Sequence, residues 1–305
     1  TELTHAGHDE MIEQKTGLKV DPYFSATKLI WLLRNKPGLA EAIQKGEVFF
    51  GTIDTWLLFR LTKGRGYATD HTNASRTLFF NLHTMQWDDA LISLFGLNGL
   101  RLPAIYPSSH SFGATDLEGL LSSAIPITAM IGDSQAAAFG EGCFEPGTAK
   151  ATMGTGCSIL MNIGSSPRLS ANGMVTTVCW SMHNRIDFAY EGVIVSCGAT
   201  IEWLKNTLGL FSDSKETAAM ALALENNDGV YLVPAFSGLG SPHWQMDRRA
   251  SITGMRFSTQ KNHIVRAALE SIAYQIRDVV TAMEKDAGIS LQELNADGGI
   301  TVNEF

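Results

Sequence analysis

Apolar residues recur at helical spacing near the start of the chain and again near its end. In the segment Ser25 to Asn35, leucines at positions 29, 32 and 33 lie on one helical face, and Ser25 is a suitable N-cap. Pro37-Gly38 is a signal for the end of that helix. His263 to Ala287 repeats the amphipathic pattern over a longer stretch. The pattern therefore predicts helices at 25–35 and 263–287.

Between these helices, short apolar and β-branched runs alternate with further helical segments. Such alternation favours an α/β fold. A hairpin is expected around the turn 154–156, with strands at 150–153 and 158–162. The other predicted strands are Val48–Phe50, Thr77–Phe80, Ile125–Ile131, Ile186–Val195, Val230–Val233 and Leu294–Ala296. The other predicted helices run from Asp54, as cap, to Leu61, from Trp87-Asp88 to near Gly96, and from Ala199 to Gly209.

One strand ends in a candidate chemical group. The apolar run 125–131 is expected to be a buried strand, and it is followed by Gly132-Asp133 and then by a helix-forming segment from Gln135. Ligands of open α/β sheets gather at the carboxyl ends of strands. Asp133 is therefore a candidate acid–base group. An Asp after a strand is also a common helix N-cap, and spacing alone favours that structural role.

Two glycine-rich turns follow predicted strands and are candidate phosphate sites. They are Met153-Gly154-Thr155-Gly156-Cys157 and Asp297-Gly298-Gly299. Successive backbone N–H groups in such turns form an anion-binding concavity, although each turn alone is more often a simple connection. Gly142 to Gly147, which includes Pro146, is the best candidate boundary between domains. We expect domains at 1–143 and 148–305, with Asp133 on one and both turns on the other.

Composition narrows the class of protein. The 305 residues are 45% hydrophobic and 18% charged, and the formal net charge is −8. These values indicate a soluble globular protein, and the acidic balance argues against a broad nucleic-acid surface. No apolar run reaches the length of a membrane span. The cysteines at 143, 157, 179 and 197 lie near apolar or glycine-rich runs, which favours buried thiols in a cytosolic protein.

Several common site motifs are absent from the sequence. It contains no G-x-x-x-x-G-K-[ST], no G-x-G-x-x-G and no H-E-x-x-H. His5-x-x-His8 lies in a polar stretch near the N-terminus that we expect to be frayed, which makes a metal site there a weak prediction. The sequence starts at Thr1 and stops at Phe305 as a new element begins, so we expect a fragment that lacks both termini of a longer protein.

Four longer motifs lie at Tyr23–Asn35, Asp70–Asn81, Pro234–Trp244 and Ser251–Glu270. Together they resemble the FGGY family of carbohydrate kinases over about residues 17–305. Two of them resemble the family's two signatures, and two are similar to its glycerol kinase branch in particular. The first signature is matched by Tyr23–Asn35, and the second by Ser251–Met255 with His263-Ile264 and Ala267–Glu270. The motifs similar to the glycerol kinase branch are Asp70–Asn81 (DHTNASRTLFFN) and Pro234–Trp244 (PAFSGLGSPHW).

The resemblance implies two actin-like, ribonuclease-H-like domains, both incomplete here, with ATP in the cleft between them. Asp133 matches the catalytic base that takes the proton of the acceptor hydroxyl and lies near Mg²⁺, directly or through water. Tyr23 matches a residue that contacts the polyol. The residues that match nucleotide-contacting positions are Gly154, Thr155, Gly198, Glu202, Gly299 and Asn303. The implied reaction is the ATP-dependent phosphorylation of glycerol to glycerol 3-phosphate.

Three positions depart from the glycerol kinase pattern. Ser134 replaces a Gln that contacts glycerol, Ser158 replaces a Phe that lines the glycerol pocket, and Glu202 replaces a nucleotide-contacting Gln. The two serines reduce bulk on the acceptor side. They keep open a longer polyol or a ketose as the substrate. The same changes keep open a catalytically inactive, kinase-like binding protein.

Further expectations follow from the same resemblance. The family's first phosphate-binding hairpin and its glycerol-gripping Arg-Glu pair are not among these residues, so the 305-residue chain alone should be inactive. We expect ATP and Mg²⁺ as cofactors, a small polyol as the partner, a homo-oligomer (dimer or tetramer) and a cytoplasmic location. A serine hydrolase is a rival reading of Gly132 to Ala136, with Ser134 as nucleophile and His183, His243 or His263 as base.

Overall fold

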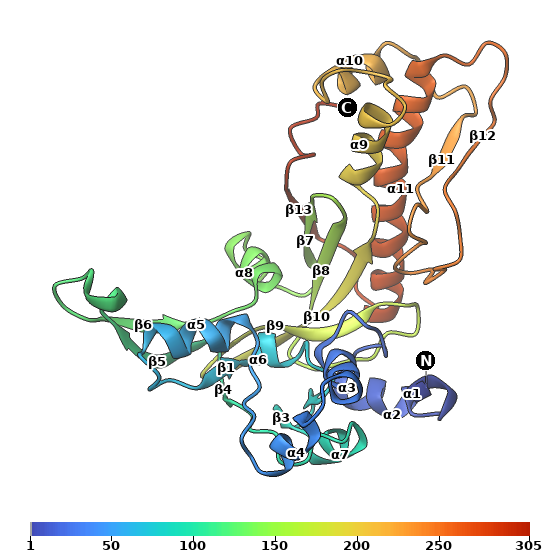
Figure 1. Ribbon diagram of the computed structural model, residues 1–305. Coiled ribbons are helices and arrows are strands. Elements are labelled where there is room, and N and C mark those ends of the chain that lie inside the picture. Colours follow the sequence, from blue (N-terminus) through green and yellow to red (C-terminus); the bar gives the residue numbers. More distant parts are fainter. Residues whose placement is uncertain (1) are drawn as a thin grey trace. The chain divides into compact units, whose positions relative to one another are not determined.

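The computed structural model describes residues 2–305, which form two compact units (Figure 1). Unit 1 contains the residues up to Gly142 together with Asn162–Leu169 and Val175–Ala189. Unit 2 contains Cys143–Met161, Ser170–Met174 and Tyr190–Phe305. Thus two segments that follow the domain boundary expected from the sequence are assigned to the first unit. Asp133 belongs to unit 1 and both glycine-rich turns belong to unit 2.

Unit 1 is built from short helices and small two-stranded sheets. Strand β1 pairs with β4 in parallel, whereas β2 pairs with β3 and β5 pairs with β6 in antiparallel fashion. Its helices are α1 (Glu2–His5), α2 (Asp9–Thr16), α3 (Ser25–Asn35), α4 (Leu39–Gln44), α5 (Ile53–Leu61), α6 (His71–Ala74), α7 (Asp89–Leu94), the 3₁₀ helix η1 (Leu117–Gly119) and α8 (Asp133–Gly140). Its strands outside the large sheet are β1 (Ala68–Asp70), β2 (Phe80–Asn81), β3 (Gln86–Trp87), β4 (Ala104–Tyr106), β5 (Ser109–Thr115) and β6 (Ile125–Ala129).

The core of unit 1 explains why α3 forms where the apolar spacing predicts it. Leu18, Phe79 and Leu97 are fully buried in one cluster. Leu29 and Leu33 of α3 pack against that cluster, whereas Leu32, which was predicted on the same face, is 36% exposed. The observed bounds, Ser25–Asn35, are those predicted from the sequence. Periodic burial on one face, rather than helix propensity alone, holds such a helix.

A five-stranded sheet places the two glycine-rich turns at one edge. Its order is β13-β7-β8-β10-β9, with β7 (Thr148–Met153), β8 (Cys157–Gly164), β9 (Val175–Met182), β10 (Arg185–Ile194) and β13 (Glu293–Asp297). The predicted hairpin is confirmed, because β7 and β8 are antiparallel. Strand β13 pairs with β7 in parallel. Since the carboxyl ends of parallel neighbours lie at the same edge, the turns after β7 and β13 lie side by side.

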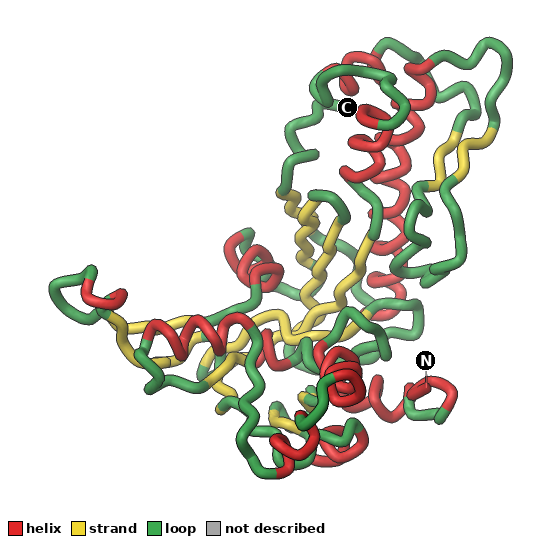
Figure 2. The backbone as a smooth tube through the Cα atoms, viewed as in Figure 1, coloured by secondary structure: helices red, strands yellow, loops and turns green. Residues whose placement is uncertain are grey.

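A long helix supports the rest of unit 2. The helix α11 (Lys261–Ala287) runs past α9 (Gly198–Asn206), α10 (Glu216–Leu222) and β11 (Tyr231–Val233), and packs against all three (Figure 2). Strand β11 pairs with β12 (Ser251–Thr253). The buried residues of α11 include Val265, Ile272, Val279 and Met283. The amphipathic pattern predicted at 263–287 is therefore confirmed, with the helix starting two residues earlier.

Several local predictions were wrong, for identifiable reasons. Leu78 has φ of 70°, which a strand does not allow, so only Phe80 of the predicted strand 77–80 is in β2. Thr52, not Asp54, occupies the N-cap of α5. The predicted strand 48–50 forms only an isolated bridge between Phe49 and Arg101. The predicted buried strand 125–131 is observed as β6, and its side chains are largely exposed.

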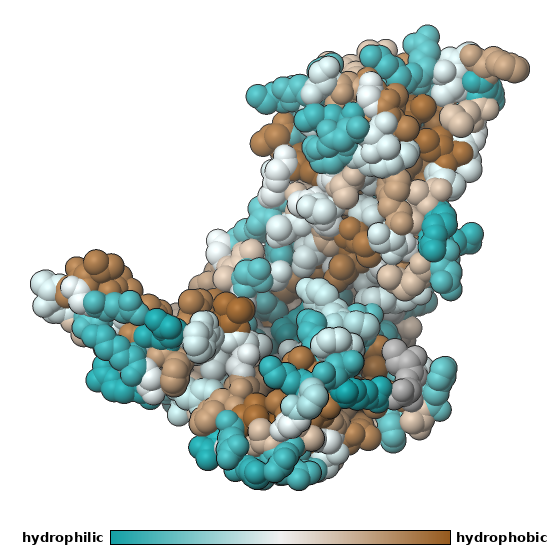
Figure 3. All heavy atoms as spheres, in the orientation of Figure 1, coloured by the Kyte–Doolittle hydropathy of each residue, from teal (hydrophilic) through white to brown (hydrophobic). Residues whose placement is uncertain are grey.

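The tip of the β5–β6 hairpin exposes apolar side chains, which appear brown in Figure 3. Leu120 is 85% exposed there. Beside it, Asp116 pairs with Lys63 and Glu118 pairs with Arg60, so ion pairs connect the hairpin tip to α5 and to the turn that follows α5. Among residues 2–305, no helix has both the length and the apolar character needed to cross a membrane.

Asp88 joins three elements of unit 1, and its removal should destabilise the protein. Its carboxylate accepts hydrogen bonds from Lys15 (2.8 and 2.9 Å), Asn81 (2.8 Å) and the backbone N–H of Leu91 (3.0 Å). Burial raises the pKa of Asp88, but the hydrogen bonds from Lys15, Asn81 and Leu91 outweigh it and hold the pKa below the usual value. We expect Asp88→Ala to lower the free energy of unfolding by about 2–3 kcal/mol at pH 7.

The pH dependence of this effect has a definite sign. A carboxylate with a depressed pKa in the folded state stabilises above its unfolded pKa, and the contribution is lost as pH falls through the folded value. The difference between wild type and Asp88→Ala should therefore shrink below about pH 4. Urea unfolding of both proteins at pH 7 and pH 3 measures this. The neighbouring Asp89→Ala removes an exposed carboxylate and should lower the free energy of unfolding much less. Equal losses of unfolding free energy in the two variants would contradict the prediction.

Candidate functional site

The turn after β7 is held by its carbonyl groups. The carbonyl of Gly154 accepts from the N–H of Gly198 (2.9 Å), and that of Thr155 accepts from Cys197 (2.9 Å) and Ala199 (3.1 Å). These donors lie at the start of α9, so the turn is fastened to the helix N-terminus. The N–H groups of Thr155 and Gly156, by contrast, donate to no other described residue. The turn therefore presents free backbone donors of the kind that bind phosphate oxygens.

Glycine is required where this turn meets its neighbours. A Cβ on Gly198 would lie 2.6 Å from the carbonyl oxygen of Gly154. A Cβ on Gly156 would lie 2.6 Å from the carbonyl oxygen of Ile194. Both contacts are with backbone, which cannot move aside cheaply. The glycines at 156 and 198 thus allow the close approach that fixes the turn.

The second turn, after β13, lies against the first strand of the hairpin. Gly298 has φ of 98°, and a Cβ on it would lie 2.2 Å from the carbonyl oxygen of Met153. The chain then continues to Asn303, whose side-chain amide donates to the hydroxyl of Thr217 near the start of α10 (2.8 Å). This bond ties the C-terminal loop to a helix.

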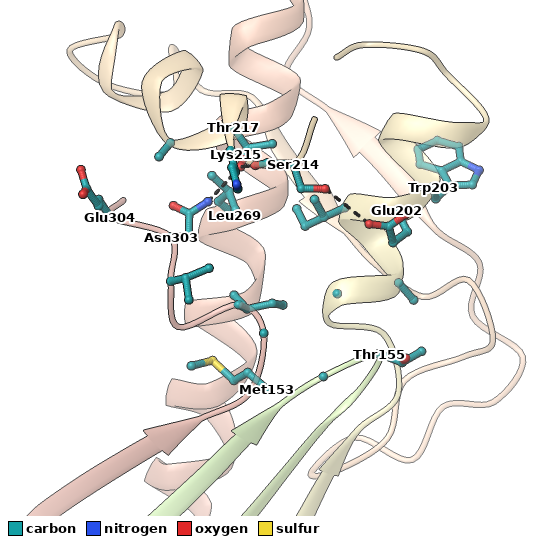
Figure 4. Close-up of a pocket in the computed structure, with 18 of the residues that line it drawn as sticks. Met153, Thr155, Glu202, Trp203, Ser214, Lys215, Thr217, Leu269, Asn303 and Glu304 are labelled. Atoms are coloured by element: carbon teal, nitrogen blue, oxygen red, sulfur yellow. Dashed lines mark hydrogen bonds between the residues drawn. The ribbon is translucent and has the colours of Figure 1, made fainter. Parts of the chain in front are cut away.

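Together these segments enclose a cavity of about 1040 Å³ in unit 2 (Figure 4). All six residues that the resemblance assigned to the nucleotide line it, and they come from three separate segments of the chain. They are Gly154 and Thr155 from the first turn, Gly198 and Glu202 from α9, and Gly299 and Asn303 from the last loop. Pockets of this size hold drug-sized ligands or cofactors.

The polar groups of the cavity are distributed along its length. Glu202, one helical turn beyond Gly198, accepts hydrogen bonds from Asn206 (2.9 Å) and from the hydroxyl of Ser214 (3.4 Å). Figure 4 shows Glu202 and Ser214 on the wall away from the turn that carries Thr155. Lys215 also lines the cavity. The carboxylate of Glu202 is thus placed away from the free N–H groups of the turn.

Sequence reasoning missed the α10 side of this cavity. Ser214, Lys215 and Thr217 line it, yet no helix was predicted there. A signal was present in the sequence, because the short polar residues Ser212, Asp213 and Ser214 come just before Lys215-Glu216 and a run that contains alanines. In the structure the carboxylate of Glu216 accepts from the N–H groups of Ser212 (3.0 Å) and Asp213 (2.7 Å). Short polar residues before a Glu and an alanine-rich run are typical of a helix start.

The cysteines near the turn are not reactive groups. All four cysteines are buried and free, as predicted for their burial. Burial raises the pKa of Cys157 to about 12, and burial also raises that of Cys197 to about 11. Both thiols therefore remain protonated at neutral pH, which excludes them as nucleophiles.

In unit 1, Asp133 is the first residue of α8 and is exposed. The N-cap is Gly132, so Asp133 does not have the capping role that its spacing suggested. One carboxylate oxygen accepts from the N–H of the half-buried Ser134 (2.7 Å). Gly132 in turn donates its N–H to the hydroxyl of Thr72 (2.8 Å). Asp133 is thus a solvent-accessible carboxylate on an anchored turn.

The two other predicted acceptor-side residues have different surroundings. Tyr23 precedes α3 and is 64% exposed, with the guanidinium of Arg76 5.9 Å from its ring centroid. Ser158 lies on β8 opposite Thr152, and its hydroxyl is buried without a hydrogen-bond partner among the described residues. Tyr23, Asp133 and Ser134 belong to unit 1, and Ser158 belongs to unit 2.

The geometry supports neither a serine hydrolase nor a metal site built from a cluster of protein side chains. In the described part of the chain, none of the three candidate histidines hydrogen-bonds Ser134; His243 contacts Asp278 (3.2 Å), and His263 accepts from the N–H of Gln260 (3.0 Å). No group of three or more His, Cys, Asp or Glu side chains within residues 2–305 is arranged to hold a metal.

Comparisons with known proteins agree with the motif resemblance. Residues 1–140 match the N-terminal domain of the FGGY family of carbohydrate kinases, and residues 149–305 match its C-terminal domain. The chain is 47% identical over 305 residues to a glycerol kinase of Xanthomonas euvesicatoria pv. vesicatoria and 48% identical over 304 residues to one of Brevibacillus brevis. All of the chain is covered in both, and it spans 61% of each relative's length.

Solved structures show the same similarity. The crystal structure of Plasmodium falciparum glycerol kinase with ADP aligns with a TM-score of 0.92 at 41% identity, covering 99% of this chain and 60% of that one. A xylulose kinase from Lactobacillus acidophilus aligns with a TM-score of 0.86 at 21% identity, covering 100% of this chain and 61% of that one, which shows the fold alone. The expected α/β fold class, with two actin-like, ribonuclease-H-like domains, is confirmed, and the chain spans about 60% of the length of these solved structures.

Proposed function

The chain belongs to the FGGY family of carbohydrate kinases, and we propose that the protein transfers the γ-phosphoryl group of ATP to glycerol, giving glycerol 3-phosphate. The observation that carries the proposal is the cavity of unit 2. Six residues matched to nucleotide contacts, separated by up to 149 positions, line that one cavity. Glycerol is chosen as the acceptor because relatives that are 45–48% identical are named glycerol kinases.

Different residues of the chain would bind the substrates and accept the proton. The free N–H groups of Thr155 and Gly156 bind phosphate oxygens, and the walls of the cavity beyond them hold the nucleoside. Asp133 takes the proton of the acceptor hydroxyl, since an exposed carboxylate on an anchored turn can reach a bound polyol. Tyr23 and Ser134 contact the polyol. Phosphoryl transfer needs little beyond this positioning and charge stabilisation.

Magnesium fits the residues present. Mg²⁺ keeps several waters and is bound by one or two carboxylates together with substrate phosphates, so it needs no protein cage. Asp133 would hold it, directly or through water, and the ion would neutralise phosphate charge when bound. We also propose that the protein is cytoplasmic and forms a homo-oligomer, as the family resemblance implies.

The choice of acceptor is tested by steady-state kinetics on the protein expressed from its complete reading frame. We expect the highest kcat/KM for glycerol, compared with four- and five-carbon polyols and ketoses, and we expect the 305-residue chain alone to be inactive. One methylene in a pocket changes binding by about 1–3 kcal/mol, so the preference should be about tenfold or more.

The other outcomes are equally informative. A preference for a longer polyol would mean that Ser134 and Ser158 enlarge the pocket, and would replace glycerol as the substrate. Nucleotide binding without turnover of any polyol would show a kinase-like binding protein instead. Titration with ATP, with and without magnesium, separates that outcome from a protein that does not bind nucleotide.

A further inference from the structure

The turn that carries Asp133 is held from a distant part of unit 1. The bond between Asp133 and the N–H of Ser134 joins adjacent residues, so it cannot fix the turn relative to the unit. The N–H of Gly132, however, donates to the hydroxyl of Thr72 at 2.8 Å, across sixty positions of sequence. This bond connects the start of α8 to α6.

The carboxylate of Asp70 determines which way the hydrogen bonds of the Thr72 hydroxyl run. Thr72 is fully buried, and its hydroxyl lies 2.9 and 2.8 Å from the two carboxylate oxygens of Asp70. A hydroxyl has one hydrogen, which goes to the carboxylate, and its lone pairs are left to accept from Gly132. A donor that is polarised by a charge becomes a better acceptor. The chain of bonds therefore runs from Gly132 through Thr72 to Asp70.

Asp70 is itself rigidly held. It is fully buried and is the N-cap of α6, accepting from the N–H groups of Thr72 and Asn73, both at 3.0 Å. The hydroxyl of Ser108 also donates to it, at 2.7 Å. The N–H of Ser108 donates to Ser181 in β9, at 2.9 Å. Asp70 is thus a fixed point tied to three elements of unit 1.

We propose that Thr72, which is itself held by a hydrogen bond to Asp70, is a positioning residue for Asp133. It fixes the position from which the Asp133 carboxylate accepts the proton. The proposal rests on the proposed role of Asp133 as base. Displacing a reacting group by about 1 Å can cost about 100-fold in rate. A hydrogen bond to the residue before the base is therefore able to control the rate without touching the substrate.

The test compares three variants of the protein expressed from its complete reading frame. Thr72→Val keeps the shape but removes both the acceptor for Gly132 and the donor to Asp70, whereas Thr72→Ser keeps the hydroxyl. Thr77→Val is the matched control, because Thr77 is equally buried and its hydroxyl donates to the carbonyl of Ala74 (2.8 Å), with no bond to Gly132.

We expect Thr72→Val to lower kcat about 10- to 30-fold with KM for the polyol changed less than about threefold. Thr72→Ser should retain at least about a third of wild-type kcat, and Thr77→Val should keep kcat even if it lowers the melting temperature. If Thr72→Val does not fold, Thr72→Cys gives a milder test, since a thiol is a weak acceptor. Equal kcat values for Thr72→Val and Thr77→Val would overturn the proposal.

Amide hydrogen exchange gives a readout that does not depend on catalysis. Protection of the Gly132 amide should fall at least about tenfold in Thr72→Val and stay unchanged in Thr77→Val. Unchanged protection in Thr72→Val would show that Thr72 does not hold the turn. If the wild-type protein phosphorylates no polyol, the proposed function fails, while the exchange result still decides whether the anchor exists.

Discussion

Asp133→Asn is expected to lower kcat by about 10²- to 10⁴-fold, with KM for the polyol and for ATP changed less than about threefold. An amide cannot take the proton of the attacking hydroxyl. Asn has the same shape as Asp, and its side-chain oxygen can still accept the hydrogen bond from the N–H of Ser134. Catalysis should therefore be lost while substrate binding and the start of α8 persist.

The chain offers a closely matched control for this variant. Asp89 is the first residue of α7, as Asp133 is of α8, and both side chains are exposed. Asp89→Asn removes the same charge from the same helix position, so it should leave kcat unchanged. Steady-state kinetics and thermal unfolding of both variants separate chemistry from stability. A folded Asp133→Asn protein with more than about a tenth of wild-type kcat would refute the assignment of the base.

Gly298→Ala is expected to weaken nucleotide binding at least about 100-fold and to lower the melting temperature. The new Cβ would lie 2.2 Å from the carbonyl oxygen and 2.6 Å from the carbonyl carbon of Met153. The φ of 98° is also strained for any residue with a side chain. Because β13 pairs with β7 up to Asp297 and Thr152, the turn cannot move away without breaking the sheet.

The adjacent glycine provides the comparison. A Cβ on Gly299 meets nothing within 4 Å, so Gly299→Ala should leave the melting temperature within about 2 °C of wild type. Isothermal titration with ADP and with ATP, beside thermal unfolding, measures both effects. Full affinity in Gly298→Ala would show that the turn after β13 plays no part in the nucleotide site.

Local signals in the sequence were sufficient for the elements that carry the site. The leucines of α3, the long amphipathic pattern of α11 and the Gly-Thr-Gly turn of the hairpin each predicted an element that the structure contains. These signals are periodic burial and turn chemistry, which act over a few residues. The two glycine-rich turns and the strand end at Asp133 could be singled out for the same reason.

Elements whose form depends on distant partners were not predictable in this way. In β9, seven successive residues from Val175 to Ser181 are buried, so no alternation of apolar and polar residues marks the strand. The hydrogen bond between Gly132 and Thr72 joins residues sixty positions apart, and no local sequence pattern near either residue predicts it. The roles of Tyr23 and Ser158 came from the family resemblance alone. Asp133 was a candidate acid–base group from its place at a strand end, and the resemblance assigned it as the base. All three roles remain predictions.

The parallel pairing of β7 with β13 also sets an order in time. Thr148–Thr152 pair with Glu293–Asp297, about 145 positions further along the chain. At about 5–20 residues per second, a ribosome needs roughly 7–30 seconds to make the intervening polypeptide. During that interval the outer edge of β7 is without its partner strand and open to wrong pairings. Strand β7 is therefore synthesised early, but it gains β13 as its neighbour only late in synthesis.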